Sequence, residues 1–439
     1  MATPETTTAP EDTAPAAPED ALAALREGGV VRSVIAFGLG FGVANVLHTL
    51  FHIVLARILK PAEYSLLASL LAVVLIFTVP IFALQATVAR EIATRVADEG
   101  EAAGGLVLRE VARWLTRWTL IVLALGAVLS LPLALIFDVH RPLPAIATAF
   151  ALLATVPIPI AWGGLQGTGR FLGLGAAQAG FAVLKFGAGV TLGLLHTGSA
   201  GVMFGVGAAS AVALGVAFLP LRELWNSARD LSHRPMNVVG KIASIALIKL
   251  GLFAALTNMD LLVARMAFPP AKAGAYAATS VAAKILLLIP LTVTTVLLPH
   301  VATLRDRRQE RDHLVAALLA VGALGVVTTA VLFSWPRPLL EVAFGDRYLA
   351  AVPWLGPLAA AMALYAVAQV YVFHFLSLDR SRYVYVLGAI VLAQTLGFAA
   401  FHGSSMALIR VQIATALVTL VVSEVFDRRA RRAPVAAPA

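Results

Sequence analysis

The chain alternates long apolar runs with short polar segments. Twelve of these runs have the length that a bilayer-spanning helix needs, which is about 20 mostly apolar residues. They cover 33–56, 64–88, 114–137, 143–162, 172–195, 201–221, 241–263, 274–298, 313–334, 350–376, 383–401 and 404–425. The runs lack the polar/apolar alternation of membrane strands, so they predict an all-α polytopic membrane protein with about 12 transmembrane helices.

One part of this pattern occurs twice. HTLFHIVLARILKP at 48–61 and LTNMDLLVARMAFP at 256–269 align at an offset of 208 residues. The alignment pairs Arg57 with Arg265, Pro61 with Pro269 and, after a four-residue insertion, Tyr64 with Tyr276. We interpret the match as a duplication, which predicts two six-helix lobes, 33–221 and 241–426, related by a parallel repeat.

Polar segments flank the predicted lobes. Residues 1–32 are rich in Ala, Pro, Thr and Glu and predict a disordered tail, 222–240 form a linker, and 427–439 form a basic tail. If the N-terminus lies inside, the inner loops and tails carry 22 of the 33 Lys and Arg residues, and the outer loops carry seven. This bias predicts a multi-pass protein with both termini in the cytoplasm.

Composition narrows the functional classes. The residues are 60% hydrophobic and 13% charged, and the net charge of +9 is explained by the basic inner loops, so nucleic-acid binding is an unnecessary interpretation. The chain has no Cys, no HExxH spacing and no phosphate-binding loop with its Lys and Ser or Thr. We therefore expect no metal site, no cofactor and no enzymatic activity. Without an ATP-binding loop the chain is not expected to use ATP hydrolysis, so Na⁺ or H⁺ is the candidate coupling ion.

Five polar residues inside the spans are candidates for a substrate cavity: Lys249, Lys284, Lys185, Asp260 and Asn258. A charge at mid-membrane costs about 2.5–3.5 kcal/mol, so such residues usually face the bundle interior or water. Asp260 follows Lys249 by eleven residues on the same helix face, and Lys284 is expected at a depth similar to that of Lys249. Several cations with one acid suit an anionic headgroup. The alternative is that each Lys forms a structural pair or snorkels to the interface.

A second polar face lies on the first span. Asn45, His48 and His52 are spaced i, i+3 and i+7, so they point together on a helix. Because His titrates near neutral pH, these residues and Asp260 are candidates for ion coupling. Hydrogen bonding between helices is the alternative. A cytoplasmic basic rim is expected at Arg90, Arg170 and Arg305.

Four segments resemble a known transporter family. They are IVLARILKPAEYSLLASLLAVV with LQATVAREIATRVADEGE, LQGTGRFLGLGAAQAGFAVLKFGAGVTLG, TNMDLLVARMAFPPAKAGAYAATSVAAKILLLIPLTVTTVLLPHVATL, and FGDRYLAAVPWLGPLAAAMAL. In this order they are similar to the first two helices, the fourth-to-fifth turn, the seventh and eighth helices and the start of the tenth helix of polysaccharide flippases of the multidrug/oligosaccharidyl-lipid/polysaccharide (MOP) superfamily. That family often shows fourteen helices, whereas about twelve are expected here. A lipid-tail groove formed by an extra helix pair is therefore not assumed.

The resemblance implies a function. Such proteins move undecaprenyl-pyrophosphate-linked sugars from the inner to the outer leaflet of the bacterial cytoplasmic membrane by alternating access, alongside glycosyltransferases or a polymerase of the pathway. Two alternatives stay open. One is a cation-coupled exporter of toxic compounds on the same scaffold, and the other is a non-transporting membrane scaffold for glycosyltransferases.

Overall fold

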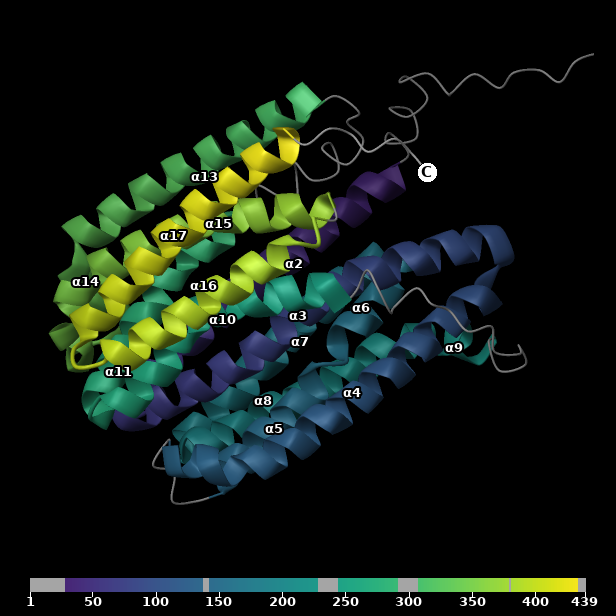
Figure 1. The fold of residues 1–439 in the computed structure, drawn as a ribbon. Helices are drawn as coiled ribbons and strands as arrows, with labels where there is room; N and C mark the ends of the chain where they lie inside the picture. The colour runs from purple at the N-terminus through teal and green to yellow at the C-terminus, as the bar shows by residue number, and fades with distance from the viewer. Residues whose placement is uncertain (1–27, 137–141, 228–243, 291–306, 379, 433–439) are drawn as a thin grey trace, which may run out of the picture.

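A computed structural model describes residues 28–136, 142–227, 244–290, 307–378 and 380–432 (Figure 1). Most of the expected N-terminal tail and inter-lobe linker, the end of the C-terminal tail and Arg305 lie outside these residues. In the described part of the chain every regular element is a helix. The first helix begins at Gly28, the last ends at Arg432, and a short helix covers Arg222–Ser227, so the helices extend into all three segments expected to be non-spanning.

The N-terminal lobe contains six helical passes. Its elements are α2 (Gly28–Ile58), α3 (Pro61–Glu99), α4 (Glu101–Ile136), α5 (Leu143–Thr155), α6 (Ile158–Gly167), α7 (Phe171–Leu194), α8 (Gly198–Phe218), η1 (Leu219–Leu221) and α9 (Arg222–Ser227). α5 and α6 together make one pass, because Pro157 and Pro159 interrupt the helix between them. α2 crosses α7 closely, with Gly40 directly against the backbone of Gly175.

The C-terminal lobe repeats this plan. Its elements are α10 (Ser244–Ala267), α11 (Pro270–Ala283), η3 (Lys284–Leu287), α13 (Arg307–Ser334), α14 (Pro336–Phe344), η4 (Asp346–Ala351), α15 (Val352–Ser377), α16 (Tyr383–Ala400) and α17 (Ser405–Arg432). Within the described residues, eleven helices are long and apolar enough to cross a membrane. The expected third span falls in α4, a helix of 36 residues. The expected all-α architecture with paired six-helix lobes is therefore confirmed.

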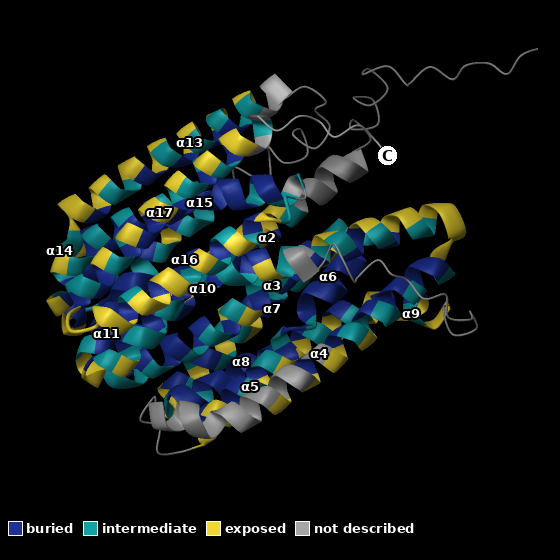
Figure 2. Ribbon diagram, viewed as in Figure 1, coloured by how far each residue is buried: buried dark blue, intermediate teal, exposed yellow. Residues whose placement is uncertain are grey.

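Burial follows the expected membrane pattern. Buried residues gather where helices face one another, and large apolar side chains stay exposed on the outer faces (Figure 2). Exposed examples on separate helices are Leu39, Leu172, Val326 and Leu396. In water such a surface would be unfavourable, whereas in a bilayer it contacts lipid chains at no cost.

The duplicated segment has the same local structure in both lobes. Each copy ends one helix just after its Arg, passes through an extended residue, and starts the next helix with a proline. The extended residues are Lys60, with ψ 148°, and Pro269, with ψ 144°. A residue before proline disfavours the helical region, and proline suits the first helical position, so sequence alone dictates this turn. Tyr64 and Tyr276 are both fully buried beyond it.

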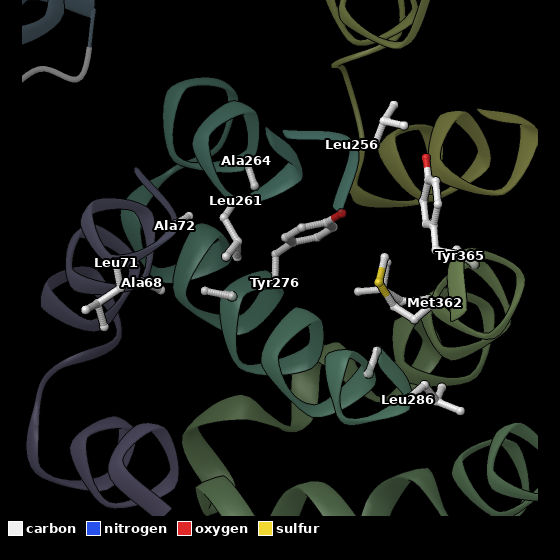
Figure 3. Close-up of a cluster of buried hydrophobic side chains, with 14 of the residues drawn as sticks. Ala68, Leu71, Ala72, Leu256, Leu261, Ala264, Tyr276, Leu286, Met362 and Tyr365 are labelled. Atoms are coloured by element: carbon white, nitrogen blue, oxygen red, sulfur yellow. The ribbon is translucent and has the colours of Figure 1, made fainter. Parts of the chain in front are cut away.

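The lobes meet along α3 and α10, which run antiparallel. Ser69 on α3 donates to the carbonyl of Leu261 on α10 at 3.2 Å, and Pro80 lies against Gly251 further along the same pair. α11 also packs on α3, where Gly274 sits against the backbone of Pro61 with no room for a side chain. Figure 3 shows this boundary, with Ala68, Leu71 and Ala72 of α3 facing Leu261, Ala264 and Tyr276.

Further contacts between the lobes gather at the end that carries the α2–α3 turn. Arg57 donates from Nε to the carbonyl of Ala343 at 2.9 Å, and its Nη2 also bonds the carbonyls of Glu341 and Val342. Tyr348 donates to the carbonyl of Ala56 at 2.8 Å. By the charge bias this end lies outside, so the lobes are joined at their predicted outer end.

Candidate functional site

Three of the four candidate residues of the C-terminal lobe, Asp260, Asn258 and Lys284, form a compact buried group. Asp260 is fully buried on α10, and Lys284 Nζ lies 3.2 Å from its Oδ1 and 3.3 Å from Asn258 Oδ1. Ser280 donates its hydroxyl to Asp260 Oδ2 at 2.6 Å. A buried carboxylate needs both a counter-charge and hydrogen bonds. Lys284 and Ser280 supply them here, and Asn258 adds an acceptor for the ammonium.

A break in the eighth span places Lys284 in this group. α11 ends at Ala283, and the chain continues as the 3₁₀ turn η3, of which Lys284 is the first residue. Pro290 lies four residues after Leu286 and has no N–H to donate to its carbonyl, which explains why regular α-helix is lost here. Mid-helix 3₁₀ segments often mark hinges.

Lys249 lies elsewhere. Its side chain is 1% exposed and donates to the backbone carbonyl of Phe375 on α15 at 3.4 Å. Asp260 is eleven residues further along α10, about 16 Å at 1.5 Å per residue. Since Lys284 binds Asp260, Lys249 and Lys284 lie at different depths, contrary to the sequence expectation. The packing of Lys249 corresponds to the structural alternative for this residue.

The N-terminal lobe supplies a second cationic position. Lys185 on α7 lies over the ring of Phe51 on α2, with Nζ 4.8 Å from the ring centroid. Gly189, one turn later, packs directly against the same ring. The close contact between α2 and α7 therefore fixes the position of Lys185 along the axis of α2. A cation over an aromatic face is partly compensated without an acid. Lys185 thus keeps its charge available to other groups.

The polar face of the first span divides into two parts. Asn45 donates to the carbonyl of Phe41 at 2.8 Å, and His48 Nδ1 lies 2.6 Å from the carbonyl of Ala44, so both bond within their own helix. His52 Nδ1 is buried and has no hydrogen-bond partner among the described residues.

The expected basic rim is described in part. Arg90 is exposed on α3. Arg170, just before α7, is also exposed and donates to the carbonyl of Pro220 in η1, which ties two ends of the same lobe together. These positions agree with a location at the lobe surface, and Arg305 lies outside the described residues.

Sequence reasoning missed several residues of the group. Ser280, which orients Asp260, was not singled out, although it precedes Lys284 by one helical turn. Phe51 beneath Lys185 was hidden in an apolar run. Arg57 was noted only as a repeated residue. Its partners on α14 are backbone carbonyls, which no pattern in the sequence identifies. In each case the decisive contact joins different helices, which spacing along one helix cannot reveal.

No protein-family model matches the chain, and no curated protein matches its sequence. Solved structures do match. The lipid II flippase MurJ in an inward closed conformation gives a TM-score of 0.66 at 13% identity, covering 91% of this chain and 88% of that one. The chain has the fold of the MOP superfamily transporters. An inward-facing multidrug resistance MATE family transporter of this superfamily gives 0.63 at 11% identity, covering 92% and 100%. A point mutant of the Vibrio cholerae MATE transporter VcmN gives 0.60 at 16%, covering 92% and 97%.

These neighbours are transporters, and none of those named is an enzyme. At 11–16% identity the MOP likeness extends to the fold alone. Both a lipid flippase and multidrug exporters share it, so the fold does not choose between them. The choice of substrate class must come from the charges inside this chain.

Proposed function

We propose that this MOP-fold protein is a flippase that moves a polyprenyl-pyrophosphate-linked glycan from the inner to the outer leaflet of a bacterial cytoplasmic membrane. The observation that carries the proposal is the charge at mid-membrane. Lys185 lies in the N-terminal lobe and Lys284 in the C-terminal lobe, and Asp260, the carboxylate among the candidate residues, is already paired with Lys284. The uncompensated charge is positive, which suits a pyrophosphate.

Anion recognition rests mainly on Lys185 in this proposal. Its ammonium packs on Phe51 rather than on a carboxylate, so it can bind phosphate oxygens without first breaking an ion pair. Lys284 adds a partly neutralised charge from the other lobe. A headgroup held between them would contact both lobes, which is the geometry that couples substrate to lobe movement.

The lobe contacts support alternating access. The two lobes are joined at the predicted outer end through Arg57 and Tyr348, and the α3–α10 contact continues from Ser69 and Leu261 to Pro80 and Gly251. A carrier waiting for substrate in the inner leaflet requires an outer closure of this kind. The lipid chain would stay in the bilayer while the headgroup crosses between the lobes.

The test is translocation in proteoliposomes loaded with a fluorescent undecaprenyl-pyrophosphate disaccharide. Exposure of the sugar on the opposite leaflet is followed by its cleavage with an added glycosidase. We expect Lys185→Gln to slow translocation at least about tenfold, because one charge-assisted contact to phosphate is worth about 1.5–3 kcal/mol. Arg410→Gln is the matched control, since Arg410 is an exposed cation on α17 and should not affect the rate.

The leading rival is a cation-coupled exporter of toxic compounds. It shares the fold, but cationic substrates would be repelled by Lys185 and by Lys284. Failure of the wild-type protein to move the lipid-linked sugar, together with export of a cationic dye, would replace our proposal with this rival. If the protein moves neither and its partners are glycosyltransferases, the scaffold alternative holds.

A further inference from the structure

Two oxygens of the C-terminal lobe, from Asp260 and Asn258, hold an ammonium group, and we call Asp260, Asn258 and the supporting Ser280 the oxygen cage. Asp260 Oδ1 and Asn258 Oδ1 lie 3.2 and 3.3 Å from Lys284 Nζ, and Ser280 holds the other carboxylate oxygen. Asp260 is 0% exposed and Asn258 is 7% exposed. Carboxylate and amide oxygens are the donors that hard cations prefer. The cage thus has the chemistry of a cation site, and Lys284 fills it.

The charge count specifies which kind of cation fits. One carboxylate balances one positive charge, and the described residues contain no cluster of three His, Cys, Asp or Glu side chains that could hold a metal ion. A divalent ion would leave a net charge in a buried site, which is unfavourable. A monovalent cation leaves the site neutral. The Lys284 ammonium, a compact point charge, meets that requirement.

We propose that Lys284 is the resident, tethered cation of this site, so that wild-type transport needs no free sodium at Asp260. The role of this site in transport rests on the proposed function, but its occupation by a cation can be tested without a transport assay. The sequence makes Asp260 a candidate for coupling transport to Na⁺. In this proposal the Lys284 ammonium already occupies the position that such an ion would take. Removing the ammonium should convert the cage into a site for a free monovalent cation.

The location of Lys284 supports a tethered ion over an ordinary structural pair. Asp260 and Asn258 lie within the regular helix α10, whereas Lys284 begins the 3₁₀ turn η3 and its side chain is 15% exposed. The oxygens of Asp260 and Asn258 are therefore held by a regular helix, whereas the cation, Lys284, is carried by the break between α11 and η3. Na⁺ is small enough to take the place of an ammonium group, whereas choline is too large.

The experiment measures thermal stability of purified full-length protein in sodium chloride and in choline chloride of equal ionic strength. Six Trp residues provide the fluorescence signal. We expect no difference between the salts for the wild type. Lys284→Ala should melt at a lower temperature in choline and recover in sodium, because sodium at ten times its Kd multiplies the folded-to-unfolded ratio by about 11. Asp260→Asn combined with Lys284→Ala should lose the response.

A second measurement covers the case in which Lys284→Ala is too unstable to purify in choline. The variant is prepared in methylammonium chloride, which returns a free ammonium to the cage and should restore the wild-type melting temperature. Sodium stabilisation of the wild type equal to that of Lys284→Ala would overturn the inference. A variant that responds to neither sodium nor methylammonium would also overturn it. None of these outcomes depends on which substrate is carried, so they are separate from the flippase test.

Discussion

Arg57 is expected to hold the outer end of the protein closed. Its guanidinium, at the end of α2, bonds the carbonyls of Glu341, Val342 and Ala343, the three residues before the last residue of α14 in the other lobe. The last carbonyls of a helix lack partners within the helix, although that of Glu341 also accepts the N–H of Gly345 at 2.9 Å, and a helix C-terminus attracts a cation. We predict that Arg57→Ala shifts the lobes toward the state that is open to the outside.

The magnitude follows from the contacts. The helix-terminus interaction contributes about 0.3–1 kcal/mol, and exposed charge-assisted contacts about 0.2–1 kcal/mol. Because Arg57 is exposed, the sum is about 0.5–2 kcal/mol. That energy changes a two-state ratio by a factor of about 2–30. The open population, and any rate proportional to it, should rise by the same factor.

The assay uses the absence of native Cys. Ser69→Cys places a thiol at the α3–α10 boundary, where Ser69 is 3% exposed, and a membrane-impermeant maleimide added outside labels it only when the lobes part. Labelling is proportional to the open population when the lobes close again faster than the reagent reacts. Arg57→Ala should speed labelling about 2–30-fold. Arg265→Ala, at the equivalent position of the repeat, is the control. An unchanged rate in Arg57→Ala, or an equal rise in Arg265→Ala, would refute the assignment.

Two further substitutions test other parts of the fold. Glu63→Ala should lower the melting temperature without changing translocation per folded molecule, because Glu63 Oε2 accepts the backbone N–H of Ser199 at 2.9 Å near the start of α8, and such caps contribute about 0.5–2 kcal/mol. Loss of translocation at unchanged stability would contradict a purely structural role. Pro290→Ala should raise the melting temperature and slow translocation, because it restores the backbone N–H that proline lacks at position 290 and stiffens the joint at η3. An unchanged rate would show that this joint does not move.

Most of the architecture could be predicted from sequence, because long apolar runs and the bias of Lys and Arg are properties of single segments. The repeated turn was also predictable, since proline geometry acts locally. The site was predictable only in its residue types. From the sequence, Lys249 and Asp260 were expected on one face of one helix, about 16 Å apart, with Lys284 near the depth of Lys249. The structure instead pairs Asp260 with Lys284 across two helices. Such a contact depends on how α10 and α11 pack, which periodicity within a helix does not encode.

The two copies of the duplicated segment have diverged toward different tasks. Arg57 joins the lobes at the outer end, whereas the Nε of Arg265 is buried and has no hydrogen-bond partner in the described structure. At the same offset His52 corresponds to Asp260, so a ring nitrogen occupies in one lobe the place of a carboxylate in the other. If both copies had kept the acid, two carboxylates would need two cations, and the site would no longer favour an anion. A single acid that is neutralised within its own lobe leaves the Lys185 ammonium without a carboxylate partner in the described contacts, and this asymmetry is what the proposed pyrophosphate substrate requires.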